Sequence, residues 1–328
     1  MISQNPLITL GSPYGIGYEI FLLTLQNTNL FSENKPFVIG SKQIMDFFQK
    51  LLDFKLNYLS VNIEEIDNIK NINLADYKFV LLDVANPQKE IKELNDITKY
   101  IDGEIAFKSI DIAADLVSKN YFKSIVTLPV SKENINLIDK TFMGHTEFFQ
   151  KKWNEQKVFM TFVSSKLNML LLTTHIPLKE VSNHITEELV ESGIKASIEL
   201  KNRLGLQKKI GFLGINPHSG ENGLIGTEEI WIKDIIAKYS KDIDGPIPAD
   251  TAFTSFNIKK YDIYITSYHD QGLIPFKMLA FDEGVNLSFG MKYIRTSVDH
   301  GTAVGLVGKK IAGLDSFINA YNVAVRLG

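Results

Sequence analysis

Cysteine is absent from this chain of 328 residues. Its absence excludes disulfide bonds, cysteine-ligated zinc and thiol nucleophiles, so any transition-metal site must use histidine, aspartate, glutamate and water. An excess of one charge is also missing, because the formal net charge is only -3 and no long block of like charges occurs. Binding of nucleic acid needs a basic patch, so we expect no nucleic-acid partner.

Long hydrophobic runs are missing as well. The longest ones, such as LNMLLL at residues 167–172, are far shorter than a segment that crosses a bilayer. The N-terminal stretch also lacks a basic region followed by a long apolar one, which is the pattern of a secretion signal. We therefore expect no membrane partner and, by default, a cytoplasmic protein.

The residues that are present alternate between two patterns. Short apolar runs predict strands, and longer stretches with apolar residues near helical spacing, above all 105–120 and 178–204, predict helices. This alternation indicates an α/β fold with a largely parallel sheet. The predicted strands are residues 6–11, 37–40, 79–84, 124–128, 158–163, 167–173, 209–215, 263–267 and 285–289.

Histidines follow three of the predicted strands. His175, His218 and His269 each stand just after such an apolar run. In open α/β sheets, ligands bind beyond the carboxyl ends of the strands, so the three imidazoles could converge on one point there. Three nitrogen ligands with open positions are typical of a catalytic metal site. The alternative is that each histidine is a strand-end residue bonded to a backbone carbonyl.

Further polar residues could hold an anion. The loop at residues 216–223 enters a helix, so its backbone N–H groups could bind phosphate, although a plain turn explains it equally well. Arg295 is suited to bidentate binding of carboxylate or phosphate. His145 and Thr146 stand at a predicted helix start, where either a phosphate contact or a simple cap is possible. Lys277 and Asn286 could contribute to the same anion site, but without further context each could also be a solvated surface residue.

A standard dinucleotide fingerprint is absent. Gly11, Gly15 and Gly17 follow the first predicted strand, but their spacing is not that of the G-x-G-x-x-G motif. The pattern alone therefore gives no basis for expecting a nicotinamide cofactor.

Several long motifs, in one order along nearly the whole chain, resemble the 4-hydroxythreonine-4-phosphate dehydrogenases of pyridoxal phosphate biosynthesis. Such a series is far more specific than a single glycine loop. The motifs are GHTEFF at 144–149, TTHIPL at 173–178, INPHSGENGLIGTEE at 215–229, GPIPADTAF at 245–253, YHDQGLIPFK at 268–277, GVN at 284–286 and IRTSVDHGTA at 294–303.

The resemblance implies two α/β/α domains similar to those of isocitrate and isopropylmalate dehydrogenases, with a cleft between the domains. We expect a terminal domain of residues 1–130 with 298–328 and a central domain of residues 131–297. The resemblance also implies a homodimer with its active site at the interface. His175 and His218 would come from one subunit and His269 from the other.

The implied reaction is a metal-dependent oxidation of 4-phosphohydroxy-L-threonine by NAD or NADP, followed by decarboxylation. The metal would be zinc, cobalt, magnesium or manganese. Lys277 and Asp250 are the candidates for the general base, and no residue is assigned to the cofactor. The positions that match the family's substrate-binding residues are His145, Thr146, Lys277, Asn286 and Arg295.

The chain departs from the family pattern at its first glycine loop and after the fourth strand. Ser12 stands where the family has an acidic residue, Tyr14 and Tyr18 are bulkier than usual, and Leu128 occupies a small position. These departures keep open a related dehydrogenase of another phosphorylated sugar acid, such as threonate or erythronate phosphate. A three-histidine metal hydrolase and a non-catalytic binding protein are the remaining alternatives.

Overall fold

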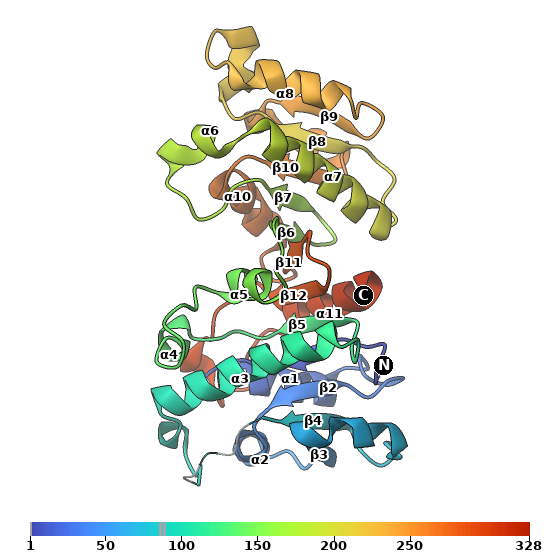
Figure 1. Cartoon of the computed structure of the whole chain (residues 1–328), viewed down its shortest axis with the longest axis vertical. Helices are drawn as coiled ribbons and strands as arrows, with labels where there is room; N and C mark the ends of the chain where they lie inside the picture. Colours follow the sequence, from blue (N-terminus) through green and yellow to red (C-terminus); the bar gives the residue numbers. More distant parts are fainter. Residues whose placement is uncertain (1, 85–86, 88–89) are drawn as a thin grey trace. The chain divides into compact units, whose positions relative to one another are not determined.

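The computed structural model describes residues 2–84, 87 and 90–328, and the chain divides into two compact units (Figure 1). Unit 1 consists of Met1–Gln156 and Met291–Gly328, and unit 2 of Lys157–Gly290. The expected boundaries lay at 130/131 and 297/298. Residues 131–156 and 291–297 nevertheless belong to unit 1, because their helices and strand pack against elements of that unit.

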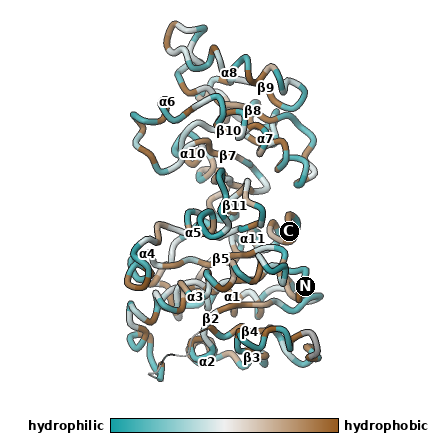
Figure 2. The backbone as a smooth tube through the Cα atoms, in the orientation of Figure 1, coloured by the Kyte–Doolittle hydropathy of each residue, from teal (hydrophilic) through white to brown (hydrophobic). Residues whose placement is uncertain are grey.

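The sheet of unit 1 has the strand order β3-β4-β2-β1-β5-β12, and each neighbouring pair is parallel. Its central strands are buried on both faces, as expected for a parallel sheet covered by helices. In Figure 2, the tube of β2 is coloured mainly as hydrophobic, in keeping with its burial. The strands are β1 Leu7–Thr9, β2 Phe37–Gly40, β3 Tyr58–Asn62, β4 Phe79–Asp83, β5 Ser124–Thr127 and β12 Ile294–Val298.

The helices of unit 1 pack on this sheet. The longest, α3, contacts β1, β2 and β5, while α11 contacts β5 and β12. Thr98 begins α3 by accepting a hydrogen bond from the Ile101 N–H through its side chain, which satisfies one of the free donors of the first turn. The helices are α1 Gly17–Asn27, α2 Lys42–Leu51, α3 Lys99–Ser118, α4 Lys132–Ile135, α5 His145–Lys152 and α11 Asp315–Leu327, with 3-10 turns η1 Ile63–Asn71, η2 Leu94–Asp96 and η6 Val304–Leu306.

The sheet of unit 2 is mixed and has the order β11-β6-β7-β10-β8-β9. Strands β7, β10, β8 and β9 are parallel, whereas β6 is antiparallel to both β7 and β11. Four parallel neighbours therefore end at one edge of the sheet. The strands are β6 Phe159–Val163, β7 Met169–Leu171, β8 Ile210–Leu213, β9 Ile243–Ile247, β10 Ile263–Thr266 and β11 Val285–Phe289.

Helices α7 and α10 both contact β7 and β10 of this sheet, and α8 contacts β9. Thr186 caps α7 by accepting from the Leu189 N–H. The helices are α6 Val181–His184, α7 Glu187–Arg203, α8 Glu228–Ala237, α9 Ala249–Ala252 and α10 His269–Ala280, with 3-10 turns η3 Leu178–Glu180, η4 Pro217–Gly223 and η5 Asn257–Lys259.

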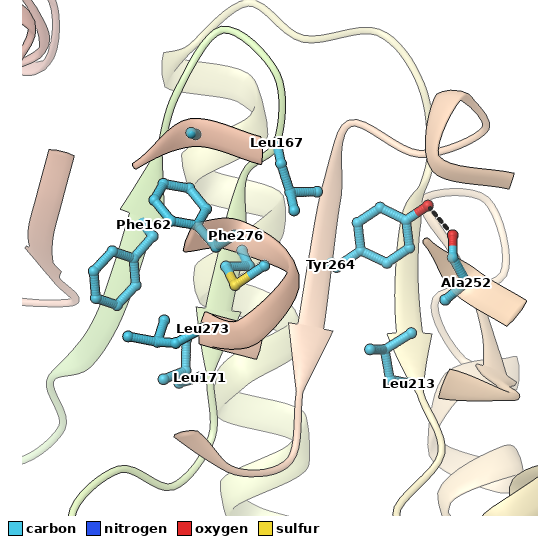
Figure 3. Packing of buried hydrophobic residues seen from close by; sticks show 10 residues of the cluster. Phe162, Leu167, Leu171, Leu213, Ala252, Tyr264, Leu273 and Phe276 are labelled. Carbon is cyan, nitrogen blue, oxygen red and sulfur yellow. Dashed lines mark hydrogen bonds between the residues drawn. The ribbon is translucent and has the colours of Figure 1, made fainter. Parts of the chain in front are cut away.

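A cluster of buried side chains holds α10 against the strands of unit 2 (Figure 3). Phe276 of α10 packs against Phe162 of β6, with ring centres 5.2 Å apart. Tyr264 of β10 lies in the same cluster, and its hydroxyl donates to the carbonyls of Ala252 and Asn257 at 3.3 and 3.0 Å. This packing holds α10, whose first residue is His269, against the sheet.

The structure confirms the α/β class and the predicted strands, but the predicted helix over 178–204 is interrupted. Residues 178–184 form a 3-10 turn and a short helix, and α7 begins anew after Thr186. The break arises because the Thr186 side chain bonds to the backbone of the next turn and ends the preceding helical run.

Three strands were not predicted, namely β3, β9 and β12. Gly245 and Pro246 lie inside β9. Because both residue types are unusual within strands, the sequence of β9 resembles that of a loop. Within the described part of the chain, the structure contains no helix that is both long and apolar enough to span a bilayer.

Candidate functional site

The three histidines of unit 2 follow three adjacent parallel strands. His175 comes after β7, His269 begins α10 after β10, and His218 lies in η4 after β8. Because β7, β10 and β8 are neighbours and run parallel, their carboxyl ends share one edge of the sheet. The strand adjacency on which the metal hypothesis depends is therefore present.

The rings of His175 and His269 lie together. Their centres are 5.6 Å apart, with an angle of 46° between the planes. Two imidazoles that bind one tetrahedral zinc ion at Zn–N distances of about 2.0–2.1 Å have ring centres roughly 5 Å apart. The observed pair therefore has a spacing that suits a shared ion.

A carboxylate orients one ring of this pair. Nδ1 of His269 lies 2.7 Å from Oδ1 of Asp270. A carboxylate that accepts from one ring nitrogen fixes the tautomer and leaves the other nitrogen unprotonated, as in many metal-binding histidines. The Nε2 atom of His269 is thus the one available as a metal ligand.

His218 stands in a backbone conformation that L-residues rarely adopt. Residues 218–222 all have positive φ, with values from 46° to 74°, and form a left-handed turn. Gly220 is the single glycine among the five. A left-handed helical conformation costs roughly 1–2 kcal/mol for each other residue. Strain of this kind persists only where the surrounding structure enforces it, and it concentrates at functional sites.

Among the described residues, no group of three or more histidine, aspartate or glutamate side chains is placed to hold a metal ion. His175 and His269 fit such a role as a pair, but His218 does not join them. Three protein ligands are usual at a catalytic zinc, so the pair alone is not a complete site of that kind.

The other predicted residues of unit 2 lie on different elements. Lys277 lies in α10, half-buried, with its ammonium 5.3 Å from the ring centre of Phe281. Asp250 lies exposed in the first turn of α9. Asn286 belongs to β11, and its Oδ1 atom is buried without a hydrogen-bond partner. A buried unpaired polar atom in a native protein calls for a missing partner, such as a ligand or water.

Unit 1 brings two of the predicted residues, His145 and Arg295, into one charged cluster. The side chain of Arg295 is buried, and its Nε and Nη2 donate to Oγ1 of Thr127 at 3.0 and 2.6 Å. Burial lowers the pKa of Arg295 to about 9, and the nearby Glu147 carboxylate acts in the opposite direction. The guanidinium therefore keeps its charge at neutral pH, inside the protein.

His145 is neutral in this cluster. Its Nε2 atom is buried without a hydrogen-bond partner. Burial, together with the charges of Arg295 and Lys132, holds the pKa of His145 well below its usual value of 6.5. With a buried cation and an unpaired imidazole, the cluster has the chemistry of an anion site.

Lys132 and Thr127 belong to the same place, although sequence reasoning did not assign them a role. Gly144 precedes His145, and a Cβ atom added to Gly144 would lie 3.4 Å from the Lys132 ammonium and 2.7 Å from the Glu147 carboxylate. Thr127, at the end of β5, and Lys132, at the start of α4, belong to the TLPVSK segment of residues 127–132, which keeps the Thr, Pro and Lys of the family that the motifs resemble. That retained pattern was the available signal. Thr146 follows His145 in the first turn of α5.

A separate cavity of about 360 Å³ lies beside the loop after β1. This volume is within the range of small-molecule sites and could hold part of a dinucleotide. The lining is rich in hydroxyl and amide groups that could donate to a nucleotide. It consists of Ser12, Tyr14, Asn95, Ile97, Lys99, Ser131, Glu133, Asn134, Thr302 and Val304.

A buried carboxylate from another element holds the loop in which Ser12 stands. Asp102 of α3 is fully buried and accepts from Ser12 Oγ at 2.6 Å, from the Tyr14 N–H at 2.7 Å and from Asn134 Nδ2 at 2.8 Å. The loop that begins at Gly11 is therefore held by a carboxylate 90 positions away from Ser12. No local pattern of residues points to this partner.

The structure places Leu128 and the first glycine in close contact. Gly11 has a φ of +72°, and an added Cβ atom would lie 2.2 Å from the carbonyl oxygen of Pro129. Leu128 is itself fully buried. Only glycine fits at position 11, whereas the larger Leu128 is accommodated in the core.

Comparisons with known proteins lead to the family that the sequence motifs resemble. A family model described as "Pyridoxal phosphate biosynthetic protein PdxA" matches residues 32–324. The chain is 36% identical to a 4-hydroxythreonine-4-phosphate dehydrogenase of Sulfurihydrogenibium sp. over 98% of its own length and 97% of the relative's. It is 31% identical to a D-threonate 4-phosphate dehydrogenase of Cupriavidus necator, with 98% and 96% covered.

Solved structures of similar proteins have the same fold. A crystal structure of a 4-hydroxythreonine-4-phosphate dehydrogenase from Klebsiella pneumoniae matches with a TM-score of 0.82 and 29% identity, covering 99% of this chain and 98% of that one. A dehydrogenase structure from Salmonella typhimurium, described in similar words, matches with a TM-score of 0.83.

The buried state of His145 leads to a prediction about stability. Because the pKa of His145 is lowered in the folded protein, the unfolded chain binds an additional proton below its ordinary pKa of about 6.5. The free energy of unfolding should therefore decrease as the pH falls below 6.5, by up to about 1.4 kcal/mol per pH unit from this residue. Urea unfolding of the wild type and of His145→Gln between pH 7.5 and 5 should show a steeper dependence in the wild type. Equal slopes would contradict a buried neutral imidazole.

Proposed function

Because the chain belongs to the pyridoxal phosphate biosynthetic protein PdxA family, we propose that it oxidises 4-phosphohydroxy-L-threonine with NAD or NADP. The 3-oxo acid then loses carbon dioxide and gives 3-amino-2-oxopropyl phosphate, a step in pyridoxal 5'-phosphate biosynthesis. The observation that carries the proposal is the charged cluster of unit 1, where Arg295 is buried beside a neutral His145 and near Lys132. Such a cluster suits a small phosphorylated acid.

The cluster would bind the substrate's phosphate. A guanidinium already turned toward Thr127 has fixed geometry, so little side-chain entropy is lost when an anion arrives. The unpaired Nε2 atom of His145 is available to the same anion, with Thr146 beside it in the first turn of α5. Lys277 and Asn286 remain proposed substrate-binding residues, as the resemblance to the family implies. Fixing the anionic groups in this way orients the carbon that reacts.

A divalent metal, such as zinc, cobalt, magnesium or manganese, would be held by His175 and His269, with His218 as the third donor. When bound, such an ion supplies Lewis-acid stabilisation of negative charge on a substrate oxygen. Asp270 contributes by holding the ring of His269 in one orientation. Lys277 and Asp250 remain the proposed groups for moving the proton of the hydroxyl. Lys277 is the better shielded of the two, since Asp250 is exposed.

We place one end of the nicotinamide cofactor in the cavity beside the β1 loop. Its lining includes Ser12, Tyr14 and Thr302, which present polar groups to the space. The backbone N–H of Tyr14 and the hydroxyl of Ser12 are occupied by Asp102, which makes the wall rigid. A rigid wall favours binding because no loop has to be ordered when the cofactor enters.

We further propose a homodimer in which the ligand set is completed by a second copy. Unit 2 exposes large apolar side chains, including Leu224, Met278 and Phe256 at 85%, 81% and 74% exposure. A protein interface that contained these side chains would remove their apolar surface from water. Since His175 and His269 already lie together in one chain, His218 is the donor that the second copy would supply. The resemblance implied His269 in that role.

D-threonate 4-phosphate is the second candidate substrate. The relative from Cupriavidus necator carries that name, and the same charged cluster would bind its phosphate. The two compounds differ at C2, which carries an amino group in 4-phosphohydroxy-L-threonine and a hydroxyl group in D-threonate 4-phosphate. The metal and cofactor chemistry would therefore be shared.

Formation of reduced nicotinamide tests the proposed activity. With 4-phosphohydroxy-L-threonine, NAD or NADP and added Co²⁺, we expect absorbance at the reduced cofactor's wavelength, and none after metal is removed with a chelator. His175→Ala should lose at least about a hundredfold of this activity, because the ion loses a direct ligand. Activity with D-threonate 4-phosphate alone would assign the second substrate. Metal-independent turnover, or full activity of His175→Ala, would refute the metal assignment.

Mixing two inactive variants tests the shared ligand set. His218→Ala and His269→Ala should each be inactive alone. After unfolding and refolding together in equal amounts, half of the dimers are mixed, and one of their two sites is intact if His218 and His269 of a site come from different copies. About a quarter of the wild-type activity should return. No return of activity, although differently tagged copies of the two variants copurify as mixed dimers, would mean that all three ligands come from one chain.

A further inference from the structure

The left-handed turn that carries His218 is held by one buried carboxylate. We propose that Glu229 is a positioning residue, which enforces this turn and thereby presents the His218 imidazole for metal binding. The inference deepens the proposed function and rests on its metal site. Glu229 lies in the first turn of α8, with a side chain only 2% exposed, and it has no part in the reaction described above.

The contacts of Glu229 lead directly to the turn. Its Oε1 accepts from the backbone N–H of Asn216 at 2.7 Å, and its Oε2 accepts from the Asn216 side-chain amide at 3.0 Å. The Asn216 carbonyl in turn accepts from the N–H of Ser219, at 3.0 Å, inside the left-handed segment. Glu229 therefore fixes the residue from which the turn starts.

The same carboxylate fills the space beneath the turn. A Cβ atom added to Gly220 would lie 2.6 Å from Glu229 Oε2, so the backbone of the turn rests against this oxygen. On the other side, a Cβ atom added to Gly226 would lie 2.0 Å from the Asn216 amide nitrogen. Glycines at both positions let the backbone approach the Glu229–Asn216 pair closely.

The bonding pattern requires a carboxylate rather than an amide. Both oxygens of Glu229 accept from donors of Asn216, and a carboxylate offers two acceptors. Glutamine at this position has the same shape but only one acceptor oxygen, so its amide group would face a donor. Glu229→Gln therefore removes one bond and introduces a repulsive contact without a change in volume.

The neighbouring carboxylate has a different part in the same network. Glu228 accepts from the Asn216 side chain at 2.8 Å and from Ser182 Oγ, but it has no contact with the Asn216 backbone N–H. Asp234 carries the same charge on α8, is exposed and has no contact of this kind with Asn216. Asp234→Asn removes the same charge from α8 and leaves the turn intact, so it is the matched control.

Titration of the full-length protein with Co²⁺, against a competing chromophoric chelator, tests the proposal. Loss of an outer-shell partner usually weakens metal binding by about tenfold to a hundredfold. We expect a loss of this size for Glu229→Gln and no change for Asp234→Asn. At saturating Co²⁺ the turnover number of Glu229→Gln should return toward the wild-type value, because His218 is still present. Hydrogen exchange of the Ser219 and Ile225 amides should be faster in Glu229→Gln.

The outcomes separate this inference from the proposed function. If His218→Ala binds Co²⁺ as tightly as the wild type, or the wild type binds none, the proposed metal site fails and the inference fails with it. If His218→Ala weakens binding but Glu229→Gln does not, the positioning role alone is overturned. The role is overturned even when the amides exchange faster, because Glu229 would then stabilise the turn without any effect on the metal.

Discussion

Parallel strands end at the same edge of a sheet, and this constraint determines where the chemistry of unit 2 lies. Strands β7, β10 and β8 are parallel neighbours, so the segments that follow them begin side by side. The rings of His175 and His269 meet there without any special loop. His218 is different, since it depends on a strained turn that Glu229 and Asn216 enforce. The proposed metal site thus combines two ligands fixed by topology with one fixed by local bonding.

In unit 1 a charged side chain, that of Arg295, is buried inside the protein. Burial of a guanidinium costs several kilocalories per mole unless partners compensate for the lost water. Arg295 has the Thr127 hydroxyl as acceptor and the Glu147 carboxylate in its surroundings, and the neighbouring His145 stays neutral. We propose that a substrate anion binds at this cluster, and such binding would also stabilise the folded protein.

Much of this arrangement could be predicted from the sequence, because apolar runs and family motifs are local signals. The motifs predicted the family and the enzyme class, both of which the comparisons confirm, and most strands lie where periodicity put them. The partners of Ser12 and Asn216 could not be predicted. Asp102 and Glu229 act through hydrogen bonds that form only after folding. Strand β9 was missed because its glycine and proline resemble a loop.

Oxidative decarboxylation is the central claim of this account, and the fate of the substrate's carboxyl carbon tests it most directly. With 4-phosphohydroxy-L-threonine labelled with ¹³C at C1, the protein, Co²⁺ and the nicotinamide cofactor, ¹³C NMR should show the label leaving as carbon dioxide and bicarbonate. One equivalent should be released for each reduced cofactor formed. Reduced cofactor with the label retained in the organic product, or label release without cofactor reduction, would contradict the account.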